Sequence, residues 1–195
     1  MSENKNYYVN EHAIVDDNVQ IGEGTKVWHF SHIQSGSKIG KKCVFGQNVN
    51  VGNNVTIGDY CKVQNNVSIY EGVTLEDYVF CGPSMVFTNI LDPKCKYPQV
   101  GAQFYIKTLV KEGASIGANA TIVCGHTLGK HCMIGAGTVV TKDVPDYALV
   151  IGTPGRVAGW VSEAGKKLKF DSEGKAFCEK SGKNYLLKDG VVTSD

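Results

Sequence analysis

A six-residue repeat runs through most of this chain and strongly limits the folds open to it. From Val15 to Phe87, and again from Val110 to Val140, every sixth residue is apolar, and sixteen of these nineteen positions hold Val, Ile or Leu. A period of six fits neither an α-helix nor an alternating hairpin strand. It predicts a solenoid of short parallel strands, in which each apolar residue points inward and stacks on its counterpart in the next coil.

Glycine directly follows nine of these inward positions. We interpret the glycines as corner residues that relieve the backbone constraint where one strand turns into the next. They are Gly22, Gly40, Gly46, Gly52, Gly58, Gly82, Gly117, Gly129 and Gly135.

The repeat is interrupted once, and the interruption is rich in residues that the repeat avoids. The stretch FCGPSMVFTNILDPKCKYPQVGAQFY spans residues 80–105 and contains prolines, lysines and a cysteine. We expect a loop over residues 88–109 that leaves one coil and returns at the next. Because long loops on rigid scaffolds are usually functional, we place the functional site beside this one.

Composition narrows the function further. Twenty Lys and Arg against nineteen Asp and Glu give a net charge of +1, which favours neither a nucleic-acid nor a membrane partner. The N-terminus MSENKNYYVN is polar, and no apolar run reaches the length of a membrane span. We therefore expect a cytoplasmic protein. The seven cysteines form no CxxC pair and are expected to be small buried residues in a reducing compartment.

The repeat ends after Val140, and two further segments follow it. TKDVPDYALVIGTPGRVAGW is expected to close the last coil, since an open coil would expose unpaired strand edges. We therefore divide the chain into a β-helix domain, residues 1–160, and a C-terminal tail, residues 161–195. In the tail, KLKF and NYLL are predicted to be two short strands of a hairpin-like unit.

The repeat, written [LIV]-G-x-x-[small]-x, resembles that of the hexapeptide-repeat acyltransferases. The resemblance implies an all-β fold, a left-handed parallel β-helix with three hexads in each coil and about six coils in all. It also implies a homotrimer with active sites between neighbouring subunits.

Longer motifs resemble a narrower group, the nucleotide-sugar 3-N-acetyltransferases. These motifs are VWHFSHI (27–33), GQNVNVG (46–52), VQNNVSIYEGVTLEDYVFCGPSMVFTN (63–89), TLVKEGASIGANATIVCG (108–125) and GWVSEAGKKL (159–168). The closest branch acts on UDP-2-acetamido-3-amino-2,3-dideoxy-D-glucuronate. The implied reaction moves acetyl from acetyl-CoA to the 3-amino group of that sugar, for O-antigen and related lipopolysaccharide glycans. Two alternatives stay open: a dTDP-3-amino-3,6-dideoxyhexose as acceptor, or a non-catalytic β-helix that serves as an assembly subunit.

The reaction needs little acid–base catalysis, because a substantial fraction of the sugar amine is already neutral near pH 7. The resemblance assigns the catalytic role to Asn89, whose amide oxygen would accept a hydrogen bond from the sugar amine; the structural alternative is an asparagine that turns the chain into the loop. His126 is the second, less favoured candidate, as a general base. His126 and His131 also stand five residues apart, as in zinc-dependent γ-class carbonic anhydrases, but the third ligand would fall near Asn89 and Ile90. We therefore predict no metal site.

The remaining candidate residues are assigned to the two substrates. Amide, phenol, imidazole and ammonium groups are expected to bind the nucleotide sugar: His29, Gln64, Asn65, Asn66, Tyr70, Lys94 and Lys107. The family often has Arg where Lys94 stands, and lysine lacks the two-pronged geometry that suits a carboxylate. Small residues would let the pantetheine arm reach the backbone: Gly117, Ala118, Gly135, Ala136 and Gly137. Two cations, Lys142 and Arg156, would meet the phosphates of CoA.

Overall fold

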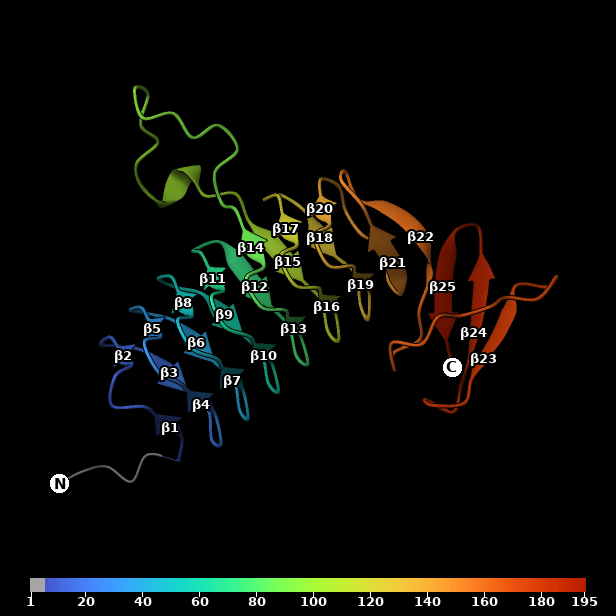
Figure 1. Cartoon of the computed structure of the whole chain (residues 1–195), viewed down its shortest axis with the longest axis horizontal. Helices are drawn as coiled ribbons and strands as arrows, with labels where there is room; N and C mark the ends of the chain where they lie inside the picture. Colours follow the sequence, from blue (N-terminus) through green and yellow to red (C-terminus); the bar gives the residue numbers. More distant parts are fainter. Residues whose placement is uncertain (1–5) are drawn as a thin grey trace.

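Away from the loop and the C-terminal end of the prism, each short strand of the repeat pairs in parallel with the strand eighteen residues further along the chain. Lys26 lies opposite Val44, and Lys62 lies opposite Phe80. Three strands therefore complete one coil, and the coils stack into a triangular prism (Figure 1). The structure, a computed structural model, describes residues 6–195. The predicted left-handed β-helix is confirmed.

The prism has three faces, named here sheets A, B and C. Sheet A contains β1 (Tyr8–Val9), β4 (Lys26–Val27), β7 (Val44–Phe45), β10 (Lys62–Val63), β13 (Phe80–Cys81), β16 (Ser115–Ile116), β19 (Met133–Ile134), β21 (Ala148–Ile151) and the antiparallel β22 (Arg156–Trp160). Sheet B contains β2 (Ile14–Val15), β5 (His32–Ile33), β8 (Asn50–Val51), β11 (Ser68–Ile69), β14 (Val86–Phe87), β17 (Thr121–Ile122) and β20 (Val139–Val140). Sheet C contains β3 (Gln20–Ile21), β6 (Lys38–Ile39), β9 (Thr56–Ile57), β12 (Val73–Leu75), β15 (Thr108–Val110) and β18 (Thr127–Leu128).

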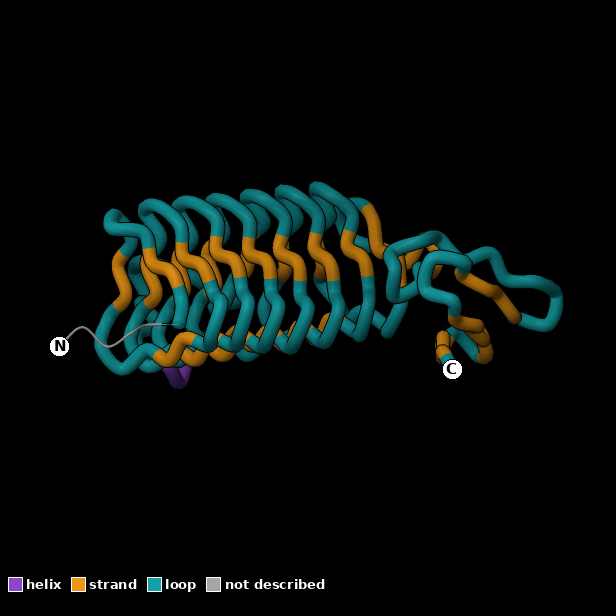
Figure 2. The backbone as a smooth tube through the Cα atoms, turned by 90° about the horizontal axis from the view of Figure 1, so that it is seen from below, coloured by secondary structure: helices purple, strands orange, loops and turns teal. Residues whose placement is uncertain are grey.

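The second residue of nearly every strand points into the prism, as the repeat predicts. Val27, Phe45 and Val63 are fully buried on sheet A, one above another. Each such side chain contributes about 1.5–3 kcal/mol when it leaves water. The stacked coils are seen from the side in Figure 2.

The prism has about eight turns, so the expected number of six was too low. β1 lies ahead of the first residue counted in the repeat and completes the first coil with β2 and β3. The start of a further coil is hidden by a shortening near the end, where Met133 pairs with Leu149, only sixteen residues away. A two-residue deletion shifts the inward positions and masks the last coil in the sequence.

The proposed reason for the nine glycines was wrong. None of them has a positive φ; they lie where the backbone of the next coil passes close by. A Cβ at Gly117 would lie 2.5 Å from the Ala136 nitrogen, and one at Gly82 would lie 2.7 Å from the Ala118 nitrogen. The left-handed conformation occurs two residues later in the hexad, for example at Asn66 (φ 62°) and Asn119 (φ 55°).

The loop leaves the prism after β14 and returns at β15, so it spans residues 88–107 and contains the short 3-10 helix η1 (Ala102–Phe104). It projects from the edge between sheets B and C (Figure 1). The coils on either side keep their register, with Val73 opposite Thr108 and Val86 opposite Thr121. The Ile106 N–H donates to the Asn89 carbonyl at 2.8 Å and closes the base of the loop.

The C-terminal tail forms a three-stranded antiparallel sheet rather than a two-stranded hairpin: β23 (Lys175–Cys178), β24 (Lys183–Lys188) and β25 (Val191–Ser194). NYLL lies in β24, as predicted, but KLKF is not one of its strands. Instead, the Leu168 N–H donates to the Trp160 carbonyl at 2.9 Å, and Leu168 joins a second small core with Tyr185 and Val192. None of the helices in the described part of the chain is long and apolar enough to cross a membrane.

Candidate functional site

Two edges of the prism carry most of the candidate residues. The edge between sheets A and B, called here the A–B edge, holds His29, Gln64, Asn65 and Asn66 together with the five small residues from Gly117 to Gly137. The edge between sheets B and C, called the B–C edge, holds the other candidates: Tyr70, Asn89, Lys94, Lys107, His126 and Lys142. Arg156 reaches the C-terminal end of this second edge. One chain therefore does not bring all its candidates into a single cleft.

Asn89 lies where the loop departs, and its side chain is held in one orientation. Its Nδ2 donates to the Glu71 carbonyl oxygen at 3.3 Å. Because a carbonyl can only accept, the nitrogen must face Glu71, which leaves the Asn89 Oδ1 on the other side. That oxygen has no hydrogen-bond partner among residues 6–195. The side chain is half-buried and so remains open to a ligand.

His126 lies on the same edge, one coil beyond the point where the loop returns. Its Nδ1 is 3.5 Å from Asp143 Oδ1, and that carboxylate oxygen also accepts the Thr127 N–H at 2.9 Å. The Leu109 N–H donates to the His126 carbonyl at 3.3 Å. Asp143 is thus fixed by the backbone and can orient the imidazole, so both catalytic candidates line one edge of the prism on neighbouring coils.

A pocket of about 300 Å³ opens at the foot of the loop, close to Asn89. Its polar side chains come from both the loop and the prism, and include Asn54, Glu71, Tyr105 and Lys107. Asn54 Nδ2 donates to Glu71 Oε1 at 3.0 Å, which holds the carboxylate against the prism. Lys94, by contrast, lies on the exposed outer part of the loop.

The amides on the A–B edge are partly used within the protein. Asn65 Oδ1 accepts the Gln47 N–H at 2.9 Å, and Asn66 Oδ1 accepts the Asn48 Nδ2 at 3.0 Å. Of the three amide side chains predicted to bind substrate, Gln64 makes no side-chain hydrogen bond in the described structure. These contacts leave the Gln64 amide and the side-chain nitrogens of Asn65 and Asn66 for a ligand.

The bond from Gln47 to Asn65 belongs to a pattern at the prism edges. In several hexads an Asp or Asn two places after the inward residue uses its side-chain oxygen to cap an N–H of the coil before it: Asp59, Asn65, Asp77 and Asp146. Asp59 accepts from Lys41 at 2.7 Å, and Asp146 accepts from Lys130 at 2.8 Å. The capping oxygen therefore satisfies a backbone donor that the parallel ladder leaves free.

Ala118 and Ala136 occupy this same hexad position but have no side chain that could cap. In the described chain their N–H groups donate to no acceptor, whereas those of Gly117, Gly135 and Gly137 are all used in the ladder. The predicted small-residue wall is thus present, but its free donors belong to the two alanines. The sequence signal for these free donors is a residue without a capping oxygen in the next coil, which is Ala136 for the N–H of Ala118 and Gly152 for the N–H of Ala136.

Lys142 and Arg156 are far apart in sequence but line one pocket of about 170 Å³ at the C-terminal end of the prism. Both side chains are exposed. The pocket also contains Asp143, the residue beside His126. Two cations at the end of the B–C edge are suited to phosphate groups.

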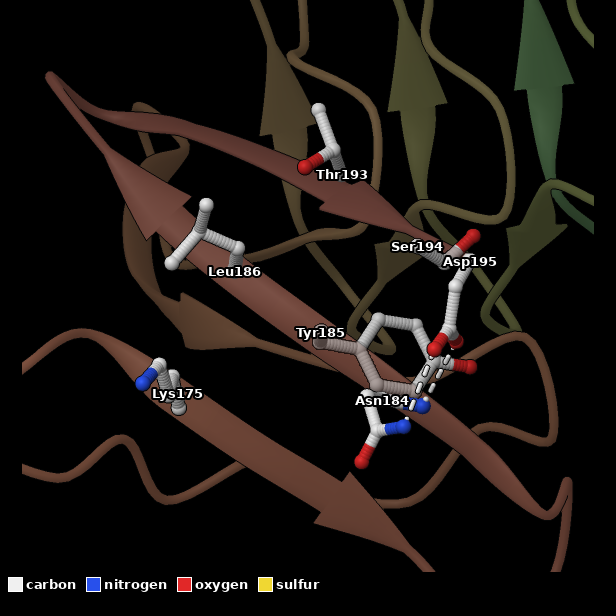
Figure 3. A pocket seen from close by; sticks show the side chains of 7 residues that line it. All are labelled: Lys175, Asn184, Tyr185, Leu186, Thr193, Ser194 and Asp195. Atoms are coloured by element: carbon white, nitrogen blue, oxygen red, sulfur yellow. Dashed lines mark hydrogen bonds between the residues drawn. The ribbon is translucent and has the colours of Figure 1, made fainter.

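A further hollow lies away from both edges. It has a volume of about 500 Å³ and opens on the C-terminal sheet (Figure 3), where its lining residues are Lys175, Asn184, Tyr185, Leu186, Thr193, Ser194 and Asp195. Asn184 and Asp195 are hydrogen-bonded to each other there. This hollow contains none of the candidate residues.

His131 lies on the third edge, between sheets C and A, so it does not share a site with His126. Its ring stacks on Tyr147 with 5.4 Å between centroids. Burial lowers the pKa of His131, although Glu163 and Glu112 partly offset this effect. Within residues 6–195, no three His, Cys, Asp or Glu side chains gather as metal ligands would.

Comparison with known proteins agrees with the repeat. A model of the bacterial transferase hexapeptide (six repeats) matches residues 18–53. A model of the hexapeptide repeat of succinyl-transferase matches residues 37–71 and 112–142. These matches identify hexapeptide repeats in both the part of the prism before the loop and the part after it.

One curated relative is the dTDP-3-amino-3,6-dideoxy-alpha-D-galactopyranose 3-N-acetyltransferase of Aneurinibacillus thermoaerophilus. The two are 51% identical over 87 residues, which cover 45% of this chain and 44% of the relative. The chain thus aligns with less than half of that protein's length.

Two solved structures share the fold. A hexapeptide-repeat acetyltransferase from Vibrio cholerae O1 biovar eltor, complexed with acetyl coenzyme A, is 26% identical with a TM-score of 0.53, over 65% of this chain and 72% of that one. A GDP-perosamine N-acetyltransferase from Caulobacter crescentus, complexed with CoA and GDP-perosamine, is 23% identical with a TM-score of 0.53, over 77% of this chain and 55% of that one.

Proposed function

We propose that this protein transfers the acetyl group of acetyl-CoA to the amino group of a nucleotide-linked amino sugar. The observation that carries the proposal is the Asn89 amide, held by its nitrogen with its oxygen unpartnered, beside the one loop that interrupts the prism. The 51% identical relative, a dTDP-amino-sugar N-acetyltransferase, supports the same chemistry. So does the acetyl coenzyme A in the Vibrio cholerae structure.

The reaction forms a C–N bond and breaks the C–S bond of the thioester. The neutral amine attacks the carbonyl carbon while Asn89 Oδ1 accepts one N–H and so directs the lone pair. The CoA sulfur leaves as a thiolate and takes the proton that the nitrogen must lose. No strong side-chain base is needed, since a useful fraction of the amine is neutral near pH 7.

The small-residue wall on the A–B edge is suited to the pantetheine arm of acetyl-CoA. Pantetheine contains two amide carbonyls, and the unpaired N–H groups of Ala118 and Ala136 are donors on consecutive coils. Consecutive coils are about 4.8 Å apart. Lys142 and Arg156 are proposed to meet the phosphates.

Because Asn89 and the two alanines lie on different edges, we propose that the working site forms between two copies in a homotrimer. A threefold axis parallel to the prism keeps equal coils at equal height, so the B–C edge of one copy can face the A–B edge of the next. The exposed loop has apolar side chains for such a contact, since Tyr97 is 70% and Val100 is 73% exposed.

For the acceptor we favour a dTDP-3-amino-3,6-dideoxyhexose, because the 51% identical relative acts on such a sugar. The second candidate is the UDP-linked 3-amino-2,3-dideoxy uronic acid. Its support is the motif resemblance and the exposed loop cations Lys94 and Lys96, which could meet a carboxylate. Either product would serve a bacterial surface glycan, made in the cytoplasm where acetyl-CoA is available.

The test is release of thiol from acetyl-CoA with both sugars assayed side by side. Turnover of only the dTDP-linked sugar supports our first choice, and turnover of only the UDP-linked uronate supports the second. If neither sugar reacts, calorimetry with CoA separates a different amino sugar from a non-catalytic β-helix. A protein that does not bind CoA would contradict the proposal.

A further inference from the structure

The A–B edge changes character along the prism. Small residues occupy the edge beyond Gly82, and amides occupy it between Gln47 and Asn66. Before them comes a cluster of rings, called here the aromatic shelf: Tyr8, His12, Trp28, His29 and Phe30.

We propose that the aromatic shelf binds the pyrimidine base of the nucleotide sugar. This inference rests on the proposed function, and it assigns the end of the substrate furthest from the reacting amine.

The rings of the shelf are close together but open to solvent. Phe30 is 67% exposed and Trp28 is 37% exposed, and their centroids lie 6.0 and 6.2 Å from that of His29. Phe30 is also stacked on His12 at 5.9 Å. Flat exposed rings are the usual surface on which a base stacks.

His29 is fixed in one tautomer by its neighbours. Asn10 Oδ1 accepts the His12 N–H at 3.0 Å, so Asn10 Nδ2 must be the atom that faces His29 Nε2 at 3.2 Å. An amide nitrogen donates, and therefore Nε2 accepts and the ring proton lies on Nδ1. The imidazole is neutral in this arrangement.

The Nδ1–H of His29 is buried and has no acceptor within the described residues. A buried donor without a partner is destabilising, and a ligand carbonyl would relieve it. Uracil and thymine both present two carbonyl oxygens. Because Nδ1 is covered in the free protein, one neighbouring ring must turn aside on binding, and the highly exposed Phe30 is free to do so.

The imide N–H of a pyrimidine finds an acceptor one coil further on. The Asn48 N–H donates to the His29 carbonyl at 3.0 Å, which puts Asn48 directly next to the shelf. Its Nδ2 donates to Asn66 Oδ1 at 3.0 Å, so its Oδ1 remains available. A neutral donor and a neutral acceptor beside stacking rings suit a pyrimidine better than an anion.

The distance along the prism from the aromatic shelf to Asn89 matches the length of the ribose and diphosphate of the substrate. Three coil steps separate Trp28, at the end of β4, from the coil of β13 and β14 that leads into Asn89. At about 4.8 Å per step, the base would lie about 14 Å below the reacting amine. A ribose and an extended diphosphate span a distance of this order.

The experiment uses the fluorescence of Trp28, one of two tryptophans in the chain. In the Trp160→Phe background, titration with dTDP or UDP should change Trp28 emission with a saturable profile. Phe30→Ala should weaken nucleotide binding by about 10- to 100-fold, the usual effect of losing one stacking ring. His29→Ala should act in the same direction, and Tyr78→Ala, on the edge between sheets C and A, should bind as the parent does.

The inference would be overturned if calorimetry showed nucleotide binding while Trp28 emission stayed constant. It would also be overturned if Phe30→Ala bound dTDP or UDP as tightly as the parent does, or if neither nucleotide bound at millimolar concentration. Failure of the proposed function looks different. In that case acetyl-CoA neither binds nor reacts, whereas the response of Trp28 to nucleotide persists.

Discussion

The amide nitrogen of Asn89 donates to the backbone carbonyl of Glu71, one coil earlier, at 3.3 Å. This bond fixes which end of the amide faces the protein and which end faces outward. A residue at the start of a loop would otherwise be free to rotate, so the relationship distinguishes an oriented group from an ordinary turn asparagine.

Replacing Asn89 should therefore affect turnover more than stability. Asn89→Ala removes the acceptor for the amine, and we expect kcat to fall by about 100-fold, with the KM for acetyl-CoA little changed. Asn89→Asp should be equally impaired, since its carboxylate would oppose the Glu71 carbonyl. Steady-state kinetics measure the effect, and thermal unfolding provides the control. Near-normal turnover by Asn89→Ala would remove this residue from the mechanism.

His126 is expected to assist rather than to act as the base. General-base catalysis contributes about 100- to 10,000-fold. If the substrate amine is neutral when it attacks, His126→Asn should lower kcat/KM by less than about 10-fold. The pH profile should follow the amine in both proteins. A larger loss of kcat/KM, accompanied by a changed pH profile, would instead make His126 the base.

Gly117 should tolerate no side chain, for a steric reason. Its added Cβ would lie 2.5 Å from the Ala136 nitrogen, and backbone atoms cannot move aside. We expect Gly117→Ala to lower the free energy of unfolding by about 3 kcal/mol. Gly137→Ala is the matched control: no atom lies within 4 Å, and only its φ of +67° opposes a side chain, at about 1 kcal/mol. Urea unfolding compares the two, and equal costs would refute the steric explanation.

His131 should make the protein less stable in acid. Burial lowers its pKa in the folded state, so the unfolded chain binds the proton more readily. The contribution of His131 is fully present above its unfolded pKa, near 6.5, and is lost as the pH falls through the lower folded value. His131→Phe keeps a ring against Tyr147 and should flatten the melting temperature between pH 5 and 7. An unchanged pH slope would contradict this assignment.

The fold could be predicted from the sequence because the coil has a fixed length and the same position always points inward. Val27, Phe45 and Val63 needed no knowledge of their neighbours to be placed in the core. The glycines were misread because close contact with the next coil is invisible along the chain. Gly82 faces the nitrogen of Ala118, which is separated from it by the whole loop.

The site was harder to predict, because a hexad position does not say which edge a residue occupies. Gln64 was assigned to the nucleotide sugar together with Tyr70 and Lys107, although it lies on a different edge from them. Counting the residues in units of eighteen would have separated them. The free amides of Ala118 and Ala136 depend on a capping oxygen that is missing from another coil, which only the stacked structure makes evident.

The preserved register across the loop has a further consequence. Val73 still pairs with Thr108 and Val86 still pairs with Thr121, so residues 88–107 leave the strand pairing of the coils on either side unchanged. Evolution, or an experimenter, could therefore exchange this segment as a cassette. Different acceptor sugars could then be served by one conserved scaffold, with only the ends near Asn89 and Ile106 held constant.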